Sequence, residues 1–462
     1  MIEAERIQVL QDKPVDPDGE YVLYWMQQSQ REPANPALEY AARCANKINK
    51  PLLVAFCVTA DYPDANRRHF AFMLEGLAET AKRIEKRGAG FVARLGSPPD
   101  IIAELAGRAA LVVCDRGYLR HQVAWRKDLA SGVDKRVVQV EGDVVVPIEC
   151  ASDKREWAAR TIRGKINDRV SDFTQTLSKT SLDVKAQALD VSGDLDLSRW
   201  QRVLDELDVD NDVAAVARFK PGTAAARAKL TRFLRSGLVG YADARNDPAD
   251  PSASELSPYL HFGQISPVEI SLKVQRAKGP SSTDKEAFIE ELIVRRELAC
   301  NFVHFTPDYD SYQCLPEWAR KTLREHTSDE RPTVYTRPQL EAADTDDPYW
   351  NAAMQEMTGT GYMHNYMRMY WGKKIIEWTN TPRYAYSTAL YLNNKYFLDG
   401  RDPNSYANIG WLFGLHDRAW TERPIFGKTR YMNAGGLERK FDIDKYVQWA
   451  NSLCDEGSGD AR

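Results

Sequence analysis

Short apolar runs alternate with longer amphipathic stretches over the first third of the chain. The apolar runs cover residues 21–25, 51–58, 90–96, 110–115 and 136–142, and the helix-like stretches between them cover 37–48, 69–87 and 101–108. Strands that alternate with helices at this spacing are typical of a parallel sheet covered by helices. We therefore predict a doubly wound α/β domain at residues 1–175. None of its helices opens with G-x-G-x-x-G, so the ordinary dinucleotide-binding motif is missing and the sheet need not hold NAD or FAD.

The pattern changes after residue 175. Residues 176–215 are rich in Ser, Asp, Leu and Lys without a sustained period, which is typical of an interdomain linker. Over residues 216–462, apolar residues recur every three to four positions and strand-like alternation is scarce. The second domain is therefore predicted to be almost entirely helical.

Composition agrees with a two-domain globular protein. The chain has 462 residues, 43% of them apolar and 28% charged, and no apolar run approaches the roughly 18 residues of a membrane span. The first residues are charged and lack the apolar core of a secretory signal, so we expect a cytoplasmic protein without membrane contact. Seven cysteines form no C-x-x-C pair, which favours reduced thiols and argues against a metal site or a disulfide framework. The default expectation for oligomeric state is a monomer.

Charge is informative only segment by segment. The formal net charge of −4 argues against a uniformly cationic surface for nucleic acid, but it leaves room for local basic faces. Basic residues outnumber acidic ones two to one between Asp417 and Lys440. A second basic cluster comprises Arg160, Arg163, Lys165 and Arg169. This second cluster is equally compatible with a solvated helix face and with phosphate contacts.

Two short motifs suggest phosphate binding, and each also has a structural interpretation. Ser254 and Ser257 could cap a helix or, with nearby backbone N–H groups, bind a phosphate, and their spacing alone favours capping. Gly359 and Gly361 follow a helix-like stretch and no strand, which favours a turn over a phosphate-binding loop.

Seven of the tryptophans lie in the last third of the chain. Trp371 and Trp378 are two helical turns apart and share one helix face, and Trp350 arrives from the preceding segment. Such a group either packs a core or relays an electron between indoles, and spacing alone favours packing.

Several longer segments resemble the class II cyclobutane pyrimidine dimer photolyases of the photolyase/cryptochrome family. They are YVLYWMQQSQR, ARNDPADPSASELSPYLHFGQIS, EELIVRRELACNFVHF, DDPYWNAAMQEM, GYMHNYMRMYWGKKIIEW, LNNKYFLDGRDPNSYANIGWLFGLHDRAW and ERPIFGKTRYMNAGGLERKFD. The resemblance extends from about residue 7 to 448. It implies a helical domain that holds FAD noncovalently in a U shape, and an α/β domain that can hold an antenna pigment, either a deazaflavin or a folate.

The resemblance also assigns individual residues. Those that resemble flavin contacts are Tyr241, Ser254, Leu256, Ser257, Arg368, Asn393, Asp399, Asp402 and Asn404. Those that resemble the electron-transfer chain, from the flavin outward to the surface, are Trp371, Trp350 and Trp378. Those that resemble contacts to the lesion or to DNA are Asn246, Glu291, Met369, Trp411, Trp420, Arg430, Arg439 and Lys440. Trp420 and Arg430 are expected to enter the gap that an extruded dimer leaves in the duplex.

Two of these residues have an explicit chemical rationale. The Asn393 amide beside the flavin N5 can either accept or donate a hydrogen bond, and so can serve different redox states. Glu290 and Glu291 point about 100° apart on a helix, so only one need face the pocket. A desolvated Glu291 would have a raised pKa and could donate to a thymine carbonyl, whereas its structural alternative is a surface pair with Arg295.

The resemblance implies light-driven repair of pyrimidine dimers in double-stranded DNA by an electron from reduced FAD. One rival is a cryptochrome-like photoreceptor without repair activity, and another is a (6-4) photolyase, for which the expected histidines are missing. His364 is interpreted as a helix-face residue of the core, not as a base. Two positions depart from the family pattern, because Cys300 and Glu438 stand where an acidic residue and a lysine are more common.

Overall fold

A six-stranded sheet forms the first part of the protein. In the computed structural model, which describes residues 2–250 and 252–457, the strand order is β1-β6-β5-β2-β3-β4. The strands are β1 (Ile7–Gln11), β2 (Tyr21–Met26), β3 (Leu52–Val58), β4 (Gly90–Leu95), β5 (Ala109–Asp115) and β6 (Val137–Val140). All neighbours pair in parallel except β1, which pairs antiparallel with β6. The predicted doubly wound sheet is confirmed, with an antiparallel edge strand that the pattern did not indicate.

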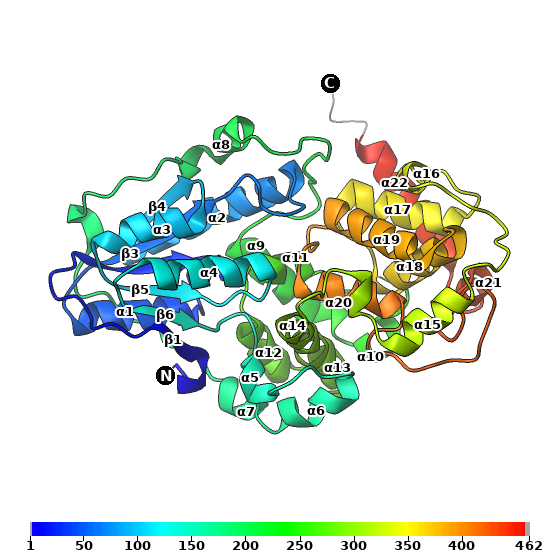
Figure 1. Cartoon of the computed structure of the whole chain (residues 1–462), viewed down its shortest axis with the longest axis horizontal. Coiled ribbons are helices and arrows are strands. Elements are labelled where there is room, and N and C mark those ends of the chain that lie inside the picture. Colours follow the sequence, from blue (N-terminus) through cyan, green and yellow to red (C-terminus); the bar gives the residue numbers. More distant parts are fainter. Residues whose placement is uncertain (1, 251, 458–462) are drawn as a thin grey trace.

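Helices cover both faces of this sheet (Figure 1). They are α1 (Pro36–Lys47), α2 (Arg67–Arg87), α3 (Pro98–Gly107) and α4 (Arg120–Gly132). Successive side chains of the central strand β2 point to opposite faces, because the side-chain period of a strand is two. Val22 and Tyr24 pack in the core with α1 and α2, whereas Leu23 and Trp25 pack with α3 and α4.

The expected linker is packed along the α/β domain. It contains η2 (Ala186–Ala188), η3 (Leu197–Arg199) and α8 (Trp200–Glu206). Leu197, Val203 and Leu204 are buried in the same core as α2. This segment therefore has a buried face although its sequence shows no helical or strand period.

Three short helices after the sheet belong to the core of the helical part. They are α5 (Ile148–Ala151), α6 (Ala159–Asn167) and α7 (Val170–Phe173). Ile162 and Phe173 are buried together with Leu230 and Phe288 from beyond residue 216. The expected boundary was residue 175, but the apolar side chains of α5, α6 and α7, which precede it, already pack with the second domain.

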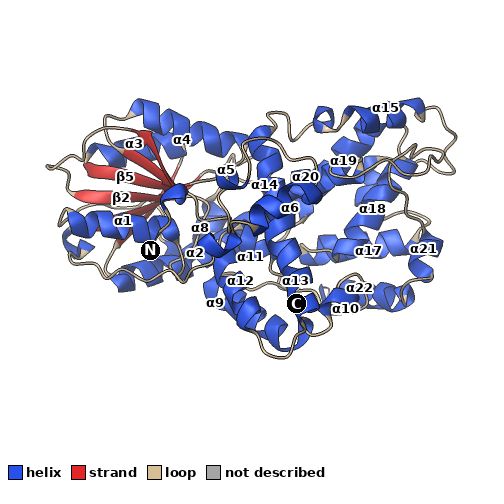
Figure 2. Ribbon diagram, turned by 90° about the horizontal axis from the view of Figure 1, so that it is seen from below, coloured by secondary structure: helices blue, strands red, loops and turns tan. Residues whose placement is uncertain are grey.

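The rest of the chain is helical (Figure 2). Its elements are α9 (Thr223–Arg232), η4 (Phe233–Gly237), α10 (Tyr241–Ala244), α11 (Ser257–His261), α12 (Pro267–Arg276), α13 (Ser282–Ile289), η5 (Glu290–Arg295), α14 (Arg296–Phe305), η6 (Tyr312–Cys314), α15 (Glu317–Glu325), α16 (Arg337–Glu341), α17 (Pro348–Thr360), α18 (Asn365–Trp378), α19 (Pro382–Tyr396), α20 (Pro403–Leu412), α21 (Ala434–Glu438) and α22 (Ile443–Gly457). Within the residues that the structure describes, no helix is both long enough and apolar enough to cross a membrane.

Local capping chemistry sets the starts of the helices around the site. Asp347, Thr381 and Asp402 each accept hydrogen bonds from the first turn of α17, α19 and α20, and a proline follows each of them. An acceptor at the N-cap followed by proline is a strong helix start, because proline lacks the N–H that would otherwise be unpaired.

The predicted glycine turn separates α17 from α18. Gly361 has a φ of 71°, a left-handed conformation that glycine adopts easily, and it ends α17. His364 then accepts from the Tyr366 N–H and caps α18. Its imidazole is 6% exposed, so the prediction of a buried residue is confirmed, but the prediction of a helix-face position is wrong because His364 precedes the helix.

Candidate functional site

One cavity in the helical part is lined by most of the residues expected to contact a flavin. Its volume is about 240 Å³. The expected contacts that line it are Tyr241, Ser254, Leu256, Ser257, Arg368, Asp399, Asp402 and Asn404, and Glu291 joins them. Asn393 is not among the described lining residues. Its side chain is 4% exposed and donates to Asn394 Oδ1 at 3.0 Å.

The serine-containing loop lies on the cavity wall. Helix α11 begins after Leu256, and no described side chain caps it, so the capping expected of Ser254 and Ser257 is wrong. Both serines line the cavity instead. Glu255 between them has a φ of 52°, and it forms ion pairs with Arg218 and Lys229. These ion pairs hold the loop in a conformation that leaves the serines on the cavity side.

Tyr241 lines the cavity from the short helix α10. The carboxylate of Asp284 accepts hydrogen bonds from the backbone N–H groups of Gly240 and Ala242, at 3.2 and 3.0 Å, and so fixes this helix. Burial, followed by the charge of Glu291, raises the pKa of Tyr241 to about 12. The phenol therefore stays protonated and can donate a hydrogen bond at any physiological pH.

An ion pair joins α18 to the loop before α20. Arg368 Nη2 lies 3.1 Å from each carboxylate oxygen of Asp399, and its Nε donates to the Met363 carbonyl at 3.0 Å. The guanidinium also lies 3.9 Å from the centre of the Phe397 ring. Because both charged side chains are less than one-fifth exposed, the pair can present a fixed dipole to a ligand in the cavity.

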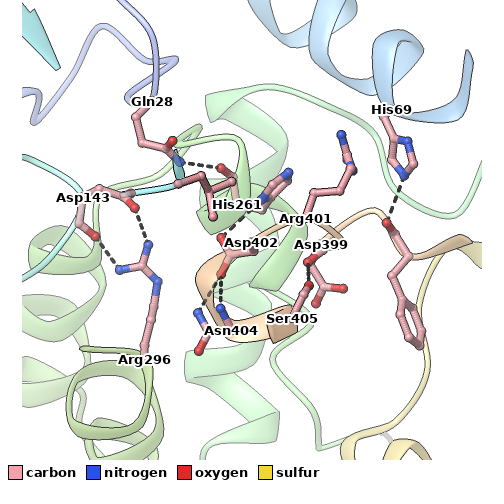
Figure 3. Close-up of polar contacts among 12 residues, drawn as sticks. Gln28, His69, Asp143, His261, Arg296, Asp399, Arg401, Asp402, Asn404 and Ser405 are labelled. Atoms are coloured by element: carbon pink, nitrogen blue, oxygen red, sulfur yellow. Dashed lines mark hydrogen bonds and ion pairs between the residues drawn. The ribbon is translucent and has the colours of Figure 1, made fainter. Parts of the chain in front are cut away.

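Asp402 lines both this cavity and a second one, and Figure 3 shows it beside His261 and Asn404. His261 Nδ1 is 3.2 Å from Asp402 Oδ2, and the Asn404 N–H donates to Oδ1 at 2.8 Å. Burial alone would raise the pKa of Asp402, but the hydrogen bond from His261 and the charge of Arg296 outweigh it and hold this pKa at about 2. Asp402 is therefore an anion across the physiological pH range.

The second cavity lies at the carboxyl ends of β2 and β3, beside the loop that precedes α20. It has a volume of about 80 Å³ and is lined by residues of both parts of the protein, among them Trp25, Tyr62, Trp125 and Arg401. This is the position next to the point where a doubly wound sheet reverses its strand order, which is where such sheets bind ligands. Arg401 is 3% exposed, and within the described part of the chain its Nε and Nη2 have no hydrogen-bond partner.

The structure brings the three expected tryptophans into one chain of contacts. Trp350 donates from its indole nitrogen to the Trp371 carbonyl at 2.9 Å, and its ring centre is 5.5 Å from that of Trp378. The expected surface position of Trp378 is wrong, because it is only 5% exposed. The Tyr335 ring, 5.1 Å away, and the Lys374 ammonium, 4.8 Å away, lie against it.

Glu291 lies on η5, a π-helical turn between α13 and α14. Such turns are rare in proteins overall, but where they occur they are often at functional sites. Glu291 Oε1 accepts from Arg245 at 2.6 Å, while Glu290 pairs with Arg163 and with Arg295. The two carboxylates thus diverge as expected. The expected desolvation of Glu291 is wrong for this state, because its side chain is 36% exposed and ion-paired.

Three other expected lesion contacts lie outside the set of residues that line the main cavity. Asn246 is exposed and follows Arg245, while Met369 and Trp411 are partly buried. The sequence analysis did not assign Arg245, which lines the main cavity and pairs with Glu291. Its position next to Asn246, in a motif already assigned to lesion contacts, could have marked it as a candidate.

Trp420 and Arg430 lie against each other. The Arg430 guanidinium is 4.3 Å from the Trp420 ring centre and 4.9 Å from that of Trp411. Asp417 accepts from Arg430 Nε at 3.0 Å and from Trp420 Nε1 at 3.3 Å. Asp417, which sequence analysis did not single out, therefore organises this stack, whose exposed end is Trp420 at 37%.

The basic clusters differ in how their charges are used. Arg439 and Lys440 are exposed near α21, whereas Arg163, Lys165 and Arg169 of the second cluster are ion-paired within the protein. These three pairs favour the solvated helix face over phosphate contact for most of that cluster.

The two departures from the family pattern lie in different environments. Cys300 is 1% exposed, and burial raises the pKa of its thiol well above the ordinary value. Glu438 is exposed and accepts from the Tyr349 hydroxyl at 3.1 Å.

Known proteins are similar to this chain in sequence and in fold. Residues 22–183 match the family described as DNA photolyase. A deoxyribodipyrimidine photo-lyase of Methanothermobacter thermautotrophicus is 47% identical over 457 residues, covering 99% of this chain and 100% of that protein. Another from Potorous tridactylus is 39% identical over 453 residues, covering 96% of this chain and 84% of that protein.

Solved structures show the same architecture. A bacterial class III photolyase from Agrobacterium tumefaciens has a TM-score of 0.74 at 21% identity, covering 93% of this chain and 86% of that chain. A Synechocystis cryptochrome has a TM-score of 0.72 at 16% identity, with 93% and 88% covered. The sheet, the helical part and the adjoining cavities thus define a protein with the fold shared by photolyases and cryptochromes. The identity with the sequence relatives goes further: the chain belongs to the DNA photolyase family.

Proposed function

We propose that the protein is a class II photolyase, which uses light and noncovalently bound FAD to split cyclobutane pyrimidine dimers in double-stranded DNA. The observation that carries this proposal is the 47% identity, over the full length of both chains, with a deoxyribodipyrimidine photo-lyase. The main cavity supports it, because residues that the sequence resemblance assigns to flavin and to lesion line the same space.

The chemistry of the main cavity suits FAD. Serine hydroxyls can donate to a diphosphate, and the Arg368–Asp399 pair offers a fixed donor and acceptor to a polar ring edge. When bound and reduced, FAD supplies upon excitation the electron that splits the dimer. Tyr241, Ser254 and Ser257 would bind and orient the cofactor.

The lesion would enter at the side of the cavity where Glu291 lies. Arg245 holds the Glu291 carboxylate at 2.6 Å, and a thymine carbonyl that reaches this pair could accept a hydrogen bond from Arg245. Met369 and Trp411 would supply apolar walls. Extrusion of the damaged bases makes such a pocket accessible, since chemistry on a base requires it to leave the stack.

The tryptophan contacts support a relay. Trp371, Trp350 and Trp378 would pass an electron inward, one indole at a time. Because Trp378 is buried against Tyr335, the outermost exposed group of such a relay would lie beyond the three tryptophans.

We place a second, light-harvesting ligand in the cavity between the two parts. Its aromatic side chains suit a planar ring system, and the Arg401 guanidinium suits an anionic group on that ligand. Deazaflavin and folate both satisfy this description, so both remain candidates. Acid extraction of the purified protein, followed by chromatography and absorbance, identifies the pigment.

The cryptochrome-like alternative has less support, because the curated relatives described above are named photo-lyases, and likeness to a cryptochrome structure at 16% identity shows the fold alone. A monomeric state and a cytoplasmic location stay predictions, which sedimentation and cell fractionation test.

One experiment tests the function directly. Ultraviolet-irradiated DNA is incubated with the reduced protein under blue light and in the dark, and the remaining dimers are counted by lesion-specific cleavage. Loss of dimers only in the light is expected, with FAD released into the supernatant upon acid precipitation. Unchanged dimer counts with FAD bound would instead favour the photoreceptor.

A further inference from the structure

Trp157 is the most exposed large apolar side chain among the described residues. Its side chain is 64% exposed, compared with 37% for Trp420. An indole offers a large apolar surface that proteins usually bury at least in part, so a tryptophan as exposed as Trp157 is informative where a contact partner can be named.

The backbone around Trp157 is held on both sides. The Glu156 N–H donates to the Asn301 side-chain oxygen at 2.8 Å, and Asn301 donates in turn to the Lys154 carbonyl at 3.0 Å. On the other side, His416 Nδ1 donates to the Trp157 carbonyl at 2.9 Å. Asn301 is fully buried. These bonds fix the backbone of an exposed ring, so little backbone entropy would be lost when the ring binds a partner.

These anchors also locate Trp157 between the two elements expected to contact the lesion. His416 directly precedes Asp417, which holds Trp420 and Arg430. On the other side, helix α6 begins two residues after Trp157 and is tied to η5 by the Arg163–Glu290 pair, next to Glu291. Short chains of contacts therefore connect Trp157 to η5, which carries Glu291, and to the segment that carries Trp420 and Arg430.

The charge around the ring complements nucleic acid. The Arg155 guanidinium lies 5.3 Å from the Trp157 ring centre, and Lys154 and Arg160 on either side are exposed. An aromatic face flanked by cations is the arrangement by which proteins hold unstacked bases, because the ring stacks on the base while the cations meet phosphates.

We propose that Trp157 stacks on the nucleotide that flanks the extruded dimer in the damaged strand. This inference rests on the proposed function. It adds to the stack of Trp420 and Arg430 a second aromatic contact, which precedes α6 and meets the damaged strand instead of the gap in the duplex.

Trp157→Ala and Trp157→Phe test the proposal, with Trp449→Ala as the control. Trp449 is another exposed tryptophan, 37% exposed, on the last helix. Base stacking by an aromatic ring predicts that Trp157→Ala weakens binding to a dimer-containing duplex by about tenfold, and that Trp157→Phe recovers most of this loss. Polarisation titrations should show a similar loss for a dimer-containing single strand, and Trp449→Ala should bind both like the wild type. Unchanged FAD content and melting temperature verify that the variants are folded.

Each other result overturns the proposal. A loss confined to duplex DNA would assign the contact to the undamaged strand, and equal losses for Trp157→Ala and Trp449→Ala would remove any special role. Wild-type binding by Trp157→Ala, together with loss of a concentration-dependent dimer in sedimentation, would make Trp157 a self-association contact. If the wild type does not prefer dimer-containing DNA, the proposed function itself fails. If the wild type prefers dimer-containing DNA and Trp157→Ala binds that DNA with the same affinity, only this inference fails.

Discussion

The indole nitrogen of Trp350 donates a hydrogen bond of 2.9 Å to the backbone carbonyl of Trp371, 21 residues further along the chain. This bond ties α17 to α18 and fixes one indole against the backbone of the next. The bond restricts rotation of the Trp350 side chain, which suits a relay between fixed rings.

We expect Trp371→Phe to abolish light-driven reduction of oxidised FAD while leaving repair intact once the flavin is chemically reduced. The reason is that the relay would feed the cofactor and not the dimer. Absorbance changes under blue light measure the first activity, and dimer counts after dithionite reduction measure the second.

Trp449→Phe is the control for that experiment, because Trp449 lies on α22 outside the chain of tryptophan contacts. If Trp371→Phe photoreduces as fast as this control, the three tryptophans only pack the core.

Glu291→Gln should lower dimer splitting per absorbed photon severalfold, without loss of FAD. The amide keeps the shape of the side chain but removes its negative charge, and it weakens the pairing with Arg245. Repair measured under limiting light, with the FAD content of each preparation, checks this expectation.

Glu290→Gln provides the matched control, because Glu290 is the neighbouring carboxylate and pairs with Arg163 and Arg295 outside the cavity. Equal repair by the two variants would show that Glu291 has no special role.

Arg430→Ala should weaken binding to dimer-containing duplex by about tenfold, because the variant loses a cation at the gap in the duplex and leaves the Trp420 ring without the guanidinium that supports it. The loss on undamaged duplex should be smaller, because only the lesion duplex presents a gap. Titrations at several salt concentrations measure both.

Arg439→Ala is the comparison variant. If Arg439 meets only phosphate, its removal should weaken binding to both duplexes alike and reduce the slope of log affinity against log salt by roughly one. Equal losses on damaged and undamaged DNA for Arg430→Ala would make Arg430 another phosphate contact.

Stability should depend on pH through Glu356. Burial raises its pKa to about 7, outweighing hydrogen bonds from Tyr446 and the His364 N–H. Because the folded protein binds this proton more tightly than the unfolded chain, the stabilisation is complete below the ordinary pKa of 4.5 and is lost as pH rises through about 7. The loss should approach about 3 kcal/mol.

Glu356→Gln should remove this part of the pH dependence of the free energy of unfolding, as measured by denaturant titrations between pH 4.5 and 8. Glu325→Gln, at a side chain that is 52% exposed, should keep it. An identical pH profile for wild type and Glu356→Gln would contradict the expectation.

The sequence by itself determined the architecture, because strand and helix periods are local properties. Parallel buried strands such as β3 appear as continuous apolar runs, and α2 and α18 appear as periodic stretches. Aspartate or threonine followed by proline likewise marks the starts of α17, α19 and α20. The resemblance to photolyase motifs identified most of the residues that line the main cavity.

Only the tertiary structure decided which side chains meet. Glu291 pairs with Arg245, 46 residues away, and His416 bonds the Trp157 carbonyl across 259 residues. The burial of Trp378 depends on Tyr335, which reaches it from another segment. Contacts of this kind follow from how helices pack, and packing depends on shape complementarity over the whole chain, so no local period contains them.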